Sequence, residues 1–258
     1  TITGTDSNIN LSTGYNWHSG VFQLVDVGGN MIRLIGKGNA STQYTKKLVG
    51  VYTGTLGSDA RIVANSNYWL ILQATNGTTV KFYDFGAQHG IRAGAMKEIR
   101  DAAGNTVVAG YHDGDPVPAF EGLLETLTDS ASNVWTFAYT NNPDHGDHKR
   151  LHTVTLCNSA SEEVARCTYT YYDANSPGVF AEGSGTDGDL MKIVVTERDA
   201  TGAQGLQRTT LFRYWTGAQG DLGAAHKRQY IVNPASYARL VEVEQSADPM
   251  KDASDALL

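Results

Sequence analysis

The richest group of possible metal ligands lies in the stretch NNPDHGDHKRLH, which begins at Asn141. Asp144, His145, Asp147 and His148 supply the carboxylate oxygens and imidazole nitrogens that a zinc-like ion takes as ligands. The stretch contains Gly and Pro, and its ligands lack the regular i, i+4 spacing that places side chains on one helix face. We therefore interpret it as a solvated loop between hairpins and expect no metal there.

Two Asp-Gly-Asp triplets offer a second kind of metal chemistry. Asp113 and Asp115 form one triplet, and Asp187 and Asp189 form the other. A calcium ion needs several oxygen ligands on a turning backbone, and these triplets supply some of them. Neither fits the twelve-residue EF-hand pattern, so ordinary Asp/Gly turns are the simpler interpretation.

Enzymatic motifs are absent from the sequence. It contains no G-x-S-x-G elbow, no H-E-x-x-H and no phosphate-binding P-loop. The pairs Glu162–Glu163 and Glu242/Glu244 are adjacent or alternate, which sends these carboxylates to different faces or to solvent. The sequence therefore predicts neither an enzyme nor a bound cofactor, with a hydrolase that uses the His/Asp loop as a remote alternative.

The two cysteines, Cys157 and Cys167, flank a polar stretch that is typical of a turn. A hairpin there would place them on neighbouring strands, within reach of a disulfide. The alternative is a pair of half-buried free thiols.

The elements that carry these residues are predicted to be strands. Short alternating runs are separated by Asn, Gly and Asp clusters, and Gly (28) far outnumbers Pro (6). In VWTFAY, Trp135, Phe137 and Tyr139 fall on one face, because side chains alternate along a strand. The fold class is all-β, with tandem antiparallel hairpins that form a curved, partly spiral sheet.

The hairpin turns share a local pattern, seen first in DAAGN. Asp101 can accept backbone N–H groups two residues on, Gly104 can take a positive φ, and Asn105 ends the turn. The same pattern occurs at Asp26, Gly29 and Asn30, at Asp129 and Asn133, and at Asp199 and Gly202. In DSASN the glycine is replaced by Ser132.

Tyrosines end the predicted strands at a nearly fixed interval. Tyr83, Tyr111 and Tyr139 are 28 residues apart, and Tyr172 and Tyr214 follow after longer insertions. Such a period indicates stacked supersecondary units, in which each hairpin covers the apolar face of its neighbour. We expect the aromatic rings to pack across strands and each hydroxyl to bond to the turn of the next unit.

The end of the chain departs from this pattern. Asn233 suits a helix N-cap and Pro234 the first helical position, and Asp248 with Pro249 repeats the arrangement. We therefore divide the chain into a sheet strip, residues 1–232, and a helical insertion or cap, residues 233–258, and expect a fragment boundary near the end.

At these residues the sequence resembles the Rhs/YD-repeat family, which includes bacterial Rhs and toxin-complex shell proteins and the animal teneurins. MKEIRDAAGNTVVAGY follows the repeat, and the Tyr-Asp pair occurs at Tyr83-Asp84 and Tyr172-Asp173. The pair is interrupted by His112 after Tyr111, and Tyr139 is followed by Thr140. The resemblance implies a β-sheet strip that spirals into a hollow shell, which encloses a toxic domain in bacterial relatives and serves adhesion in teneurins.

Charge and hydropathy limit the partners. The net charge of −7 and the lack of a Lys/Arg cluster argue against nucleic acid, and the apolar runs are too short to span a bilayer. We expect a secreted or cell-surface structural module whose partners are other repeats of the same or neighbouring chains, or an enclosed cargo domain. Self-assembly is possible through sheet edges. The alternative is a carbohydrate-binding sheet, with or without calcium.

Overall fold

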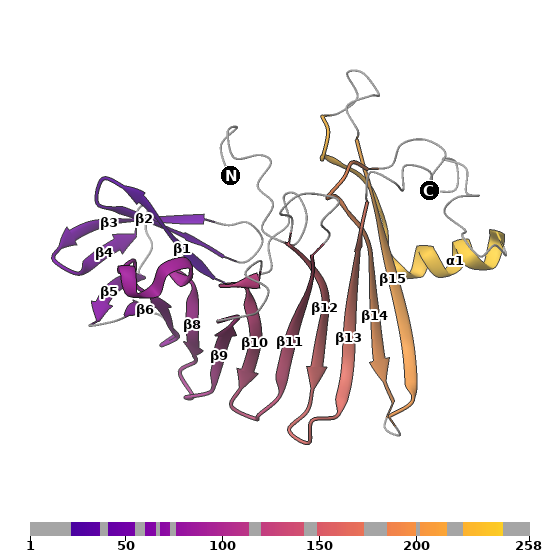
Figure 1. Ribbon diagram of the computed structural model, residues 1–258, viewed down its shortest axis with the longest axis horizontal. Coiled ribbons are helices and arrows are strands. Elements are labelled where there is room, and N and C mark those ends of the chain that lie inside the picture. The colour runs from indigo at the N-terminus through magenta and orange to yellow at the C-terminus, as the bar shows by residue number, and fades with distance from the viewer. Residues whose placement is uncertain are drawn as a thin grey trace. The chain divides into compact units, whose positions relative to one another are not determined.

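The computed structural model describes ten segments of the chain: residues 22–36, 41–54, 60–65, 68–72, 76–113, 120–141, 149–172, 185–199, 202–215 and 224–244. Within them, sixteen antiparallel strands are hydrogen-bonded in sequence order, each to the next along the chain (Figure 1). The predicted all-β class and its chain of antiparallel hairpins are therefore confirmed.

The first eight strands are β1 (Gln23–Gly28), β2 (Met31–Ile35), β3 (Ser41–Leu48), β4 (Val51–Gly54), β5 (Arg61–Asn65), β6 (Tyr68–Leu72), β7 (Thr79–Tyr83) and β8 (Met96–Arg100). The next eight are β9 (Thr106–Tyr111), β10 (Leu124–Asp129), β11 (Val134–Asn141), β12 (Lys149–Cys157), β13 (Glu163–Tyr171), β14 (Leu190–Arg198), β15 (Gln204–Tyr214) and β16 (Arg228–Val232). The 3₁₀ segment η2 (Ala87–Arg92) joins β7 to β8, and the helix α1 (Pro234–Glu244) follows β16. The chain divides into two compact units between Thr136 and Phe137.

In the first unit the sheet closes on itself. Gln23 of β1 pairs with Ala95, directly before β8, and the Leu24 N–H donates to the Gly94 carbonyl oxygen at 2.8 Å. Gly94 permits this approach, because a Cβ on it would lie 2.1 Å from the Leu24 carbonyl oxygen. Its φ of +77° also favours glycine. The outer edge of β1 is thus partly paired at this end.

The interior of this closed sheet is filled with side chains. Each strand from β1 to β8 with described side chains directs at least one residue inward, and Ile62 and Phe82 are fully buried. The inward set consists of Leu24, Ile32, Tyr44, Tyr52, Ile62, Ile71, Val80, Phe82 and Met96. Val80 and Phe82 alternate along β7, as strand geometry requires. This unit is therefore a packed core, and the hollow interior implied by the resemblance does not describe it.

The second unit has longer strands, and its core lies under the end of the chain. Seven buried residues form one cluster: Tyr172, Leu190, Leu211, Phe212, Tyr214, Val232 and Leu240. Leu240 comes from α1, which lies next to β15. The helix therefore covers the apolar face that these strands cannot bury among themselves.

The predicted start of this helix is confirmed. Pro234 is its first residue, and the Asn233 side-chain oxygen accepts the Ser236 N–H at 3.0 Å. Such a cap satisfies one of the N–H groups that a helix leaves unpaired at its start. The second predicted helix, at Asp248 and Pro249, lies outside the described residues. No helix that the structure describes is long and apolar enough to cross a lipid bilayer.

Candidate functional site: repeated connections and a buried Asp–His cluster

The DAAGN hairpin turn is held by its own side chains. The Asp101 carboxylate accepts both the backbone N–H and the side-chain N–H of Asn105, each at 2.8 Å. Gly104 has a φ of +92° and donates its N–H to the Asp101 carbonyl oxygen. The bond from the Asn105 side chain is the main reason why the pKa of Asp101 lies below its usual value.

The turn at Asp129 keeps these bonds without a glycine. Its carboxylate accepts the backbone and side-chain N–H groups of Asn133, each at 2.9 Å. Ser132 takes the left-handed position with a φ of +64°. These bonds lower the pKa of Asp129, and the bond from the Asn133 side chain has the largest effect. The hydrogen bonds between the first and fifth residues therefore occur in both turns, whereas the glycine occurs in only one of them.

A third turn of this kind joins β12 to β13, where the sequence predicted a polar turn but not this hydrogen-bond pattern. Asn158 stands in the Asp position and Glu162 in the Asn position, so that the acid and the amide exchange places. The Asn158 side-chain oxygen accepts the Glu162 N–H at 3.0 Å, and Ser161 has a φ of +62°. The signal was present, because NSASE repeats the centre of DSASN with the two ends exchanged.

The remaining two predicted turns differ from each other. The Asp199 turn follows the pattern, since Gly202 donates to the Asp199 carbonyl oxygen and has a φ of +78°. At Asp26 the loop is shorter, because Gly29 and Asn30 alone join the pair Gly28↔Met31. Both have a positive φ, of 60° and 65°, which is the geometry of a two-residue hairpin. As predicted, the Asp26 carboxylate accepts the N–H two residues on, that of Gly28, at 2.9 Å, but the loop has two residues and differs in length from the DAAGN turn.

On the opposite side of the hairpins, a second connection recurs four times. In the first, the Tyr83 N–H donates to the Ala95 carbonyl oxygen at 3.0 Å, and the Gly94 N–H donates back to Tyr83 at 3.1 Å. The same two bonds occur at three further residues, His112, Tyr172 and Trp215. Their N–H groups donate to the carbonyl oxygens of Leu123, Asp189 and Lys227, and the N–H groups of Gly122, Gly188 and His226 donate back to their carbonyl oxygens. The residue that donates the return bond has a left-handed backbone each time. Its φ is +77° at Gly94, +79° at Gly122, +91° at Gly188 and +64° at His226.

This repeat corrects the predicted alignment. Tyr83 is equivalent to His112, and Tyr111 lies one residue earlier. The equal spacing of the tyrosines concealed a shift of one residue, which places adjacent side chains on opposite faces. The rings of Tyr83 and Tyr111 nevertheless meet edge to face, with centroids 6.1 Å apart.

The tyrosine hydroxyls make bonds other than the predicted ones. Tyr111 donates to the Met96 carbonyl oxygen at 2.5 Å, which closes its own hairpin, β8–β9. Tyr171 does the same in β12–β13. Tyr172 instead crosses β14 and donates to the Phe212 carbonyl oxygen of β15 at 2.9 Å.

The other predicted residues of the Tyr-Asp pattern have separate positions. Tyr214 is buried and meets Tyr172 edge to face, with centroids 6.4 Å apart. Burial raises the pKa of Tyr139. The Asp84 carboxylate accepts the Gly86 N–H at 2.9 Å, at the start of η2. Asp173 lies outside the described residues.

In the second unit, a cluster of polar side chains joins the connection before β14 to the connection before β16. Asp189 is fully buried, and its Oδ2 accepts the N–H and the hydroxyl of Thr186 at 2.9 and 3.0 Å. Nδ1 of His226 lies 3.1 Å from Asp189 Oδ1 and 2.8 Å from the Thr186 hydroxyl oxygen. Because a carboxylate accepts and does not donate, Nδ1 carries the proton in this arrangement.

The geometry of this cluster is not that of a nucleophile with its base. In such a relay the two imidazole nitrogens face different partners, one the acid and the other the hydroxyl. Here the hydroxyl and the carboxylate meet the same nitrogen, Nδ1 of His226. The cluster therefore holds the connection before β14 against the connection before β16.

A partly buried ion pair lies beside it. Arg150 is 4% exposed, and its Nη2 donates to Asp187 Oδ1 at 2.9 Å. The guanidinium also stands over the Tyr171 ring, 5.7 Å from its centroid. Asp187 and Asp189, which the sequence offered as calcium ligands, are thus used by an arginine and a histidine.

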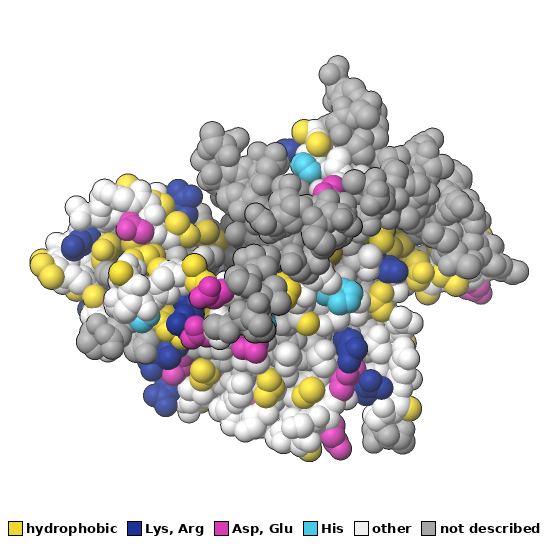
Figure 2. Space-filling view, viewed as in Figure 1, with side chains coloured by type: hydrophobic (Ala, Val, Ile, Leu, Met, Phe, Trp, Pro, Cys, Tyr) yellow, Lys and Arg dark blue, Asp and Glu magenta, His cyan; other side chains and the backbone are white. Residues whose placement is uncertain are grey.

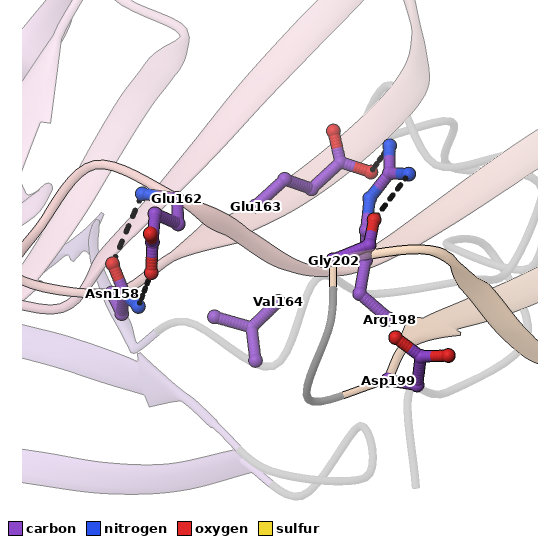
Figure 3. Close-up of a pocket in the computed structure, with 7 residues that line it drawn as sticks. All are labelled: Asn158, Glu162, Glu163, Val164, Arg198, Asp199 and Gly202. Atoms are coloured by element: carbon purple, nitrogen blue, oxygen red, sulfur yellow. Dashed lines mark hydrogen bonds and ion pairs between the residues drawn. The ribbon is translucent and has the colours of Figure 1, made fainter.

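A cavity of about 630 Å³ lies at the tips of β12–β13 and β14–β15 (Figure 3). Glu163 faces Arg198 across it, with Oε1 3.1 Å from the guanidinium, and also pairs with Arg166. Desolvation raises the pKa of Glu163, but the hydrogen bonds and charges of the two arginines outweigh it and leave the pKa below its usual value. This carboxylate is therefore ionised and paired, and does not resemble a general acid.

The remaining candidates are not brought together. Asp113 pairs with Arg92 at 3.2 Å, whereas Asp115, Asp144, His145, Asp147 and His148 lie outside the described residues. In the segments that the structure describes, no three His, Cys, Asp or Glu side chains gather as metal ligands would. The candidate disulfide is not formed. Cys167 pairs with Val154 and Cys157 with Glu163, so the register separates two free thiols.

Comparison with known proteins gives a likeness of fold. No protein-family profile matches the sequence, and no curated protein matches it. The crystal structure of TcdB2-TccC3-Cdc42 matches with a TM-score of 0.50 and 10% identity, over 81% of this chain and 15% of that chain. TcdB2-TccC3 without its hypervariable C-terminal region matches with a TM-score of 0.51 and 10% identity, over 81% and 14%. The chain thus has the fold of a part of these TcdB2-TccC3 chains and spans about one seventh of their length.

Proposed function

We propose that this chain is a structural module of a β-sheet shell, which belongs to a larger assembly and encloses another polypeptide. The observation that carries the proposal is the recurring strand connection, within a fold that matches TcdB2-TccC3 over 81% of the chain. A wall needs a sheet that extends by repetition, and the two alternating kinds of turn supply that repetition. A secreted or cell-surface location and membership of the Rhs/YD-repeat type are parts of the same proposal.

The use of the reactive side chains supports a passive role. Asp189, His226 and Thr186 bind one another, and Arg150 with Asp187 forms an ion pair. Four of the aromatic residues that could stack on sugars are buried, namely Phe137, Tyr172, Phe212 and Tyr214, and others such as Trp135 and Tyr139 are half-buried. These polar and aromatic side chains therefore bind one another and hold the strands together. This favours a structural wall over a catalyst or a glycan-binding face.

Protease protection in the natural assembly tests the proposal. The protein is isolated from its source cells and treated with protease, and the polypeptides that survive are identified by mass spectrometry. We expect a second polypeptide to resist digestion with wild type. It should become cleavable with Gly188→Val, because Gly188 is buried and left-handed in a connection.

The matched control is Gly202→Val, at an exposed hairpin tip with no atom within 4 Å of the new Cβ. It carries a similar φ, so backbone strain is common to both variants. Isolation of wild type as a lone chain, or with a partner that protease digests at once, would contradict the proposal.

A further inference from the structure

The tip of the β3–β4 hairpin exposes two aliphatic side chains. Val49 is 96% exposed and Leu48 is 70% exposed. Leu48 pairs with Val51, so Val49 and Gly50 form a two-residue loop. Gly50 has a φ of +72° and meets the conformational demand of the turn. Nothing in this geometry requires an aliphatic residue at Val49.

Other described tips are made of small or polar residues. Their turn sequences are GN at β1–β2, DAAGN at β8–β9, DSASN at β10–β11 and NSASE at β12–β13. A turn normally faces water, and an apolar apex there gains nothing from folding. The β3–β4 tip, residues 46–50, is therefore a surface feature that the fold does not explain.

The charge around this tip is positive. Lys46 and Lys47 directly precede Leu48, and both are exposed. Residues 22–72 contain five Lys or Arg against two Asp or Glu, a net charge of +3 in a chain of net charge −7. Asp26 is the one carboxylate in the described part of this range. Figure 2 shows hydrophobic and basic side chains close together over the β3–β4 end of the molecule.

We propose that the β3–β4 tip docks onto an anionic lipid membrane. Val49 and Leu48 would enter the boundary between headgroups and acyl chains, where exposed aliphatic groups leave water. Lys46 and Lys47 would stay at the headgroup level, because their long stems let the ammonium groups reach the lipid phosphates and carboxylates. The occupant is identified by this charge complementarity. The inference does not depend on the proposed shell function.

Vesicle sedimentation of the full chain tests this docking. One set of vesicles is phosphatidylcholine alone, and the other is phosphatidylcholine mixed with phosphatidylserine. We expect reversible binding to the anionic set, weaker binding at high salt, and little binding to the neutral set. Replacing both lysines, Lys46→Gln with Lys47→Gln, should weaken binding roughly thirtyfold, at about fivefold for each charge near the surface.

The aliphatic contribution is measured with the double variant Leu48→Ser and Val49→Ser. We expect its affinity for the anionic vesicles to fall about tenfold or more, since most of the burial energy is lost. The matched control is Leu206→Ser, which removes an aliphatic side chain that is 56% exposed on β15. It should bind as wild type does.

The outcomes separate the explanations. Thermal unfolding of each variant should match wild type, because the replaced side chains are exposed. Binding that persists in the Leu48/Val49 variant, or wild-type protein that stays in the supernatant with anionic vesicles, would overturn the proposal. Loss of binding in Leu206→Ser to the same degree would show general hydrophobic adsorption and would overturn it as well.

Discussion

Replacing Gly94 with alanine tests whether the first unit is held closed by one close backbone approach. The new Cβ would lie 2.1 Å from the Leu24 carbonyl oxygen, which is backbone and cannot rotate away. The φ of +77° at Gly94 adds strain for any residue with a Cβ. We therefore expect Gly94→Ala to force β1 away from Ala95.

The expected cost has three parts. The left-handed backbone costs about 1–2 kcal/mol for alanine. Overpacking against a fixed atom costs about 1–3 kcal/mol, and the bond from Leu24 to Gly94 contributes about 0.5–1.5 kcal/mol. Gly94→Ala should therefore destabilise the first unit by about 2.5–6.5 kcal/mol.

Gly104→Ala is the matched control. Gly104 has a φ of +92°, and a Cβ there would meet no atom within 4 Å. This variant should cost only the backbone strain, about 1–2 kcal/mol. The difference between the two variants isolates the closure of the sheet from the conformational cost of alanine.

Urea denaturation gives the total effect, and amide hydrogen exchange locates it. In Gly94→Ala the N–H of Leu24 should exchange much faster than in wild type, because its acceptor is displaced. In Gly104→Ala this amide should stay protected. Equal losses of stability in the two variants, with a protected Leu24 amide in both, would refute the reasoning.

Three further changes probe the turns, the hydroxyls and the buried cluster. Tyr111→Phe removes the bond to the Met96 carbonyl oxygen and should cost about 0.5–1.5 kcal/mol in urea denaturation. The pKa of Asp129 is lowered on folding, so its stabilisation is present above the ordinary Asp pKa and lost as pH falls through the folded value. The stability difference between Asp129→Ala and wild type should therefore shrink in acid. In Asp189→Asn the new side-chain NH2 group faces groups that themselves donate hydrogen bonds, His226 among them. The change should therefore cost about 1–3 kcal/mol in thermal unfolding.

Two residues of the same chain serve as controls. Tyr230 is 38% exposed, so Tyr230→Phe should cost less than Tyr111→Phe. Glu197 pairs with Arg208 where both side chains are about half exposed, so Glu197→Gln should have little effect. A pH-independent penalty for Asp129→Ala, or an unchanged melting temperature for Asp189→Asn, would contradict the roles assigned above.

The local structure was largely predictable. Alternation in VWTFAY predicted β11, and the turn residues at Asp101, Asp129 and Asp199 predicted three hairpins, because these effects act within a few residues. The turn at Asn158 was predicted as a polar turn, but its likeness to the Asp101 turn was not, because the acid and the amide exchange places. The alignment of Tyr83 with Tyr111 failed because equal spacing does not fix register.

The sequence by itself therefore determined the all-β class, the hairpin turns at Asp101, Asp129 and Asp199, and where α1 begins. Tertiary structure alone decided that β1 returns to Gly94, that Asp189 meets His226 across two connections, and that Cys157 and Cys167 are out of register. The physical reason is the distance along the chain over which each interaction acts. Turn chemistry and strand alternation are set by neighbours along the chain, whereas closure and pairing depend on how the curvature of many strands accumulates.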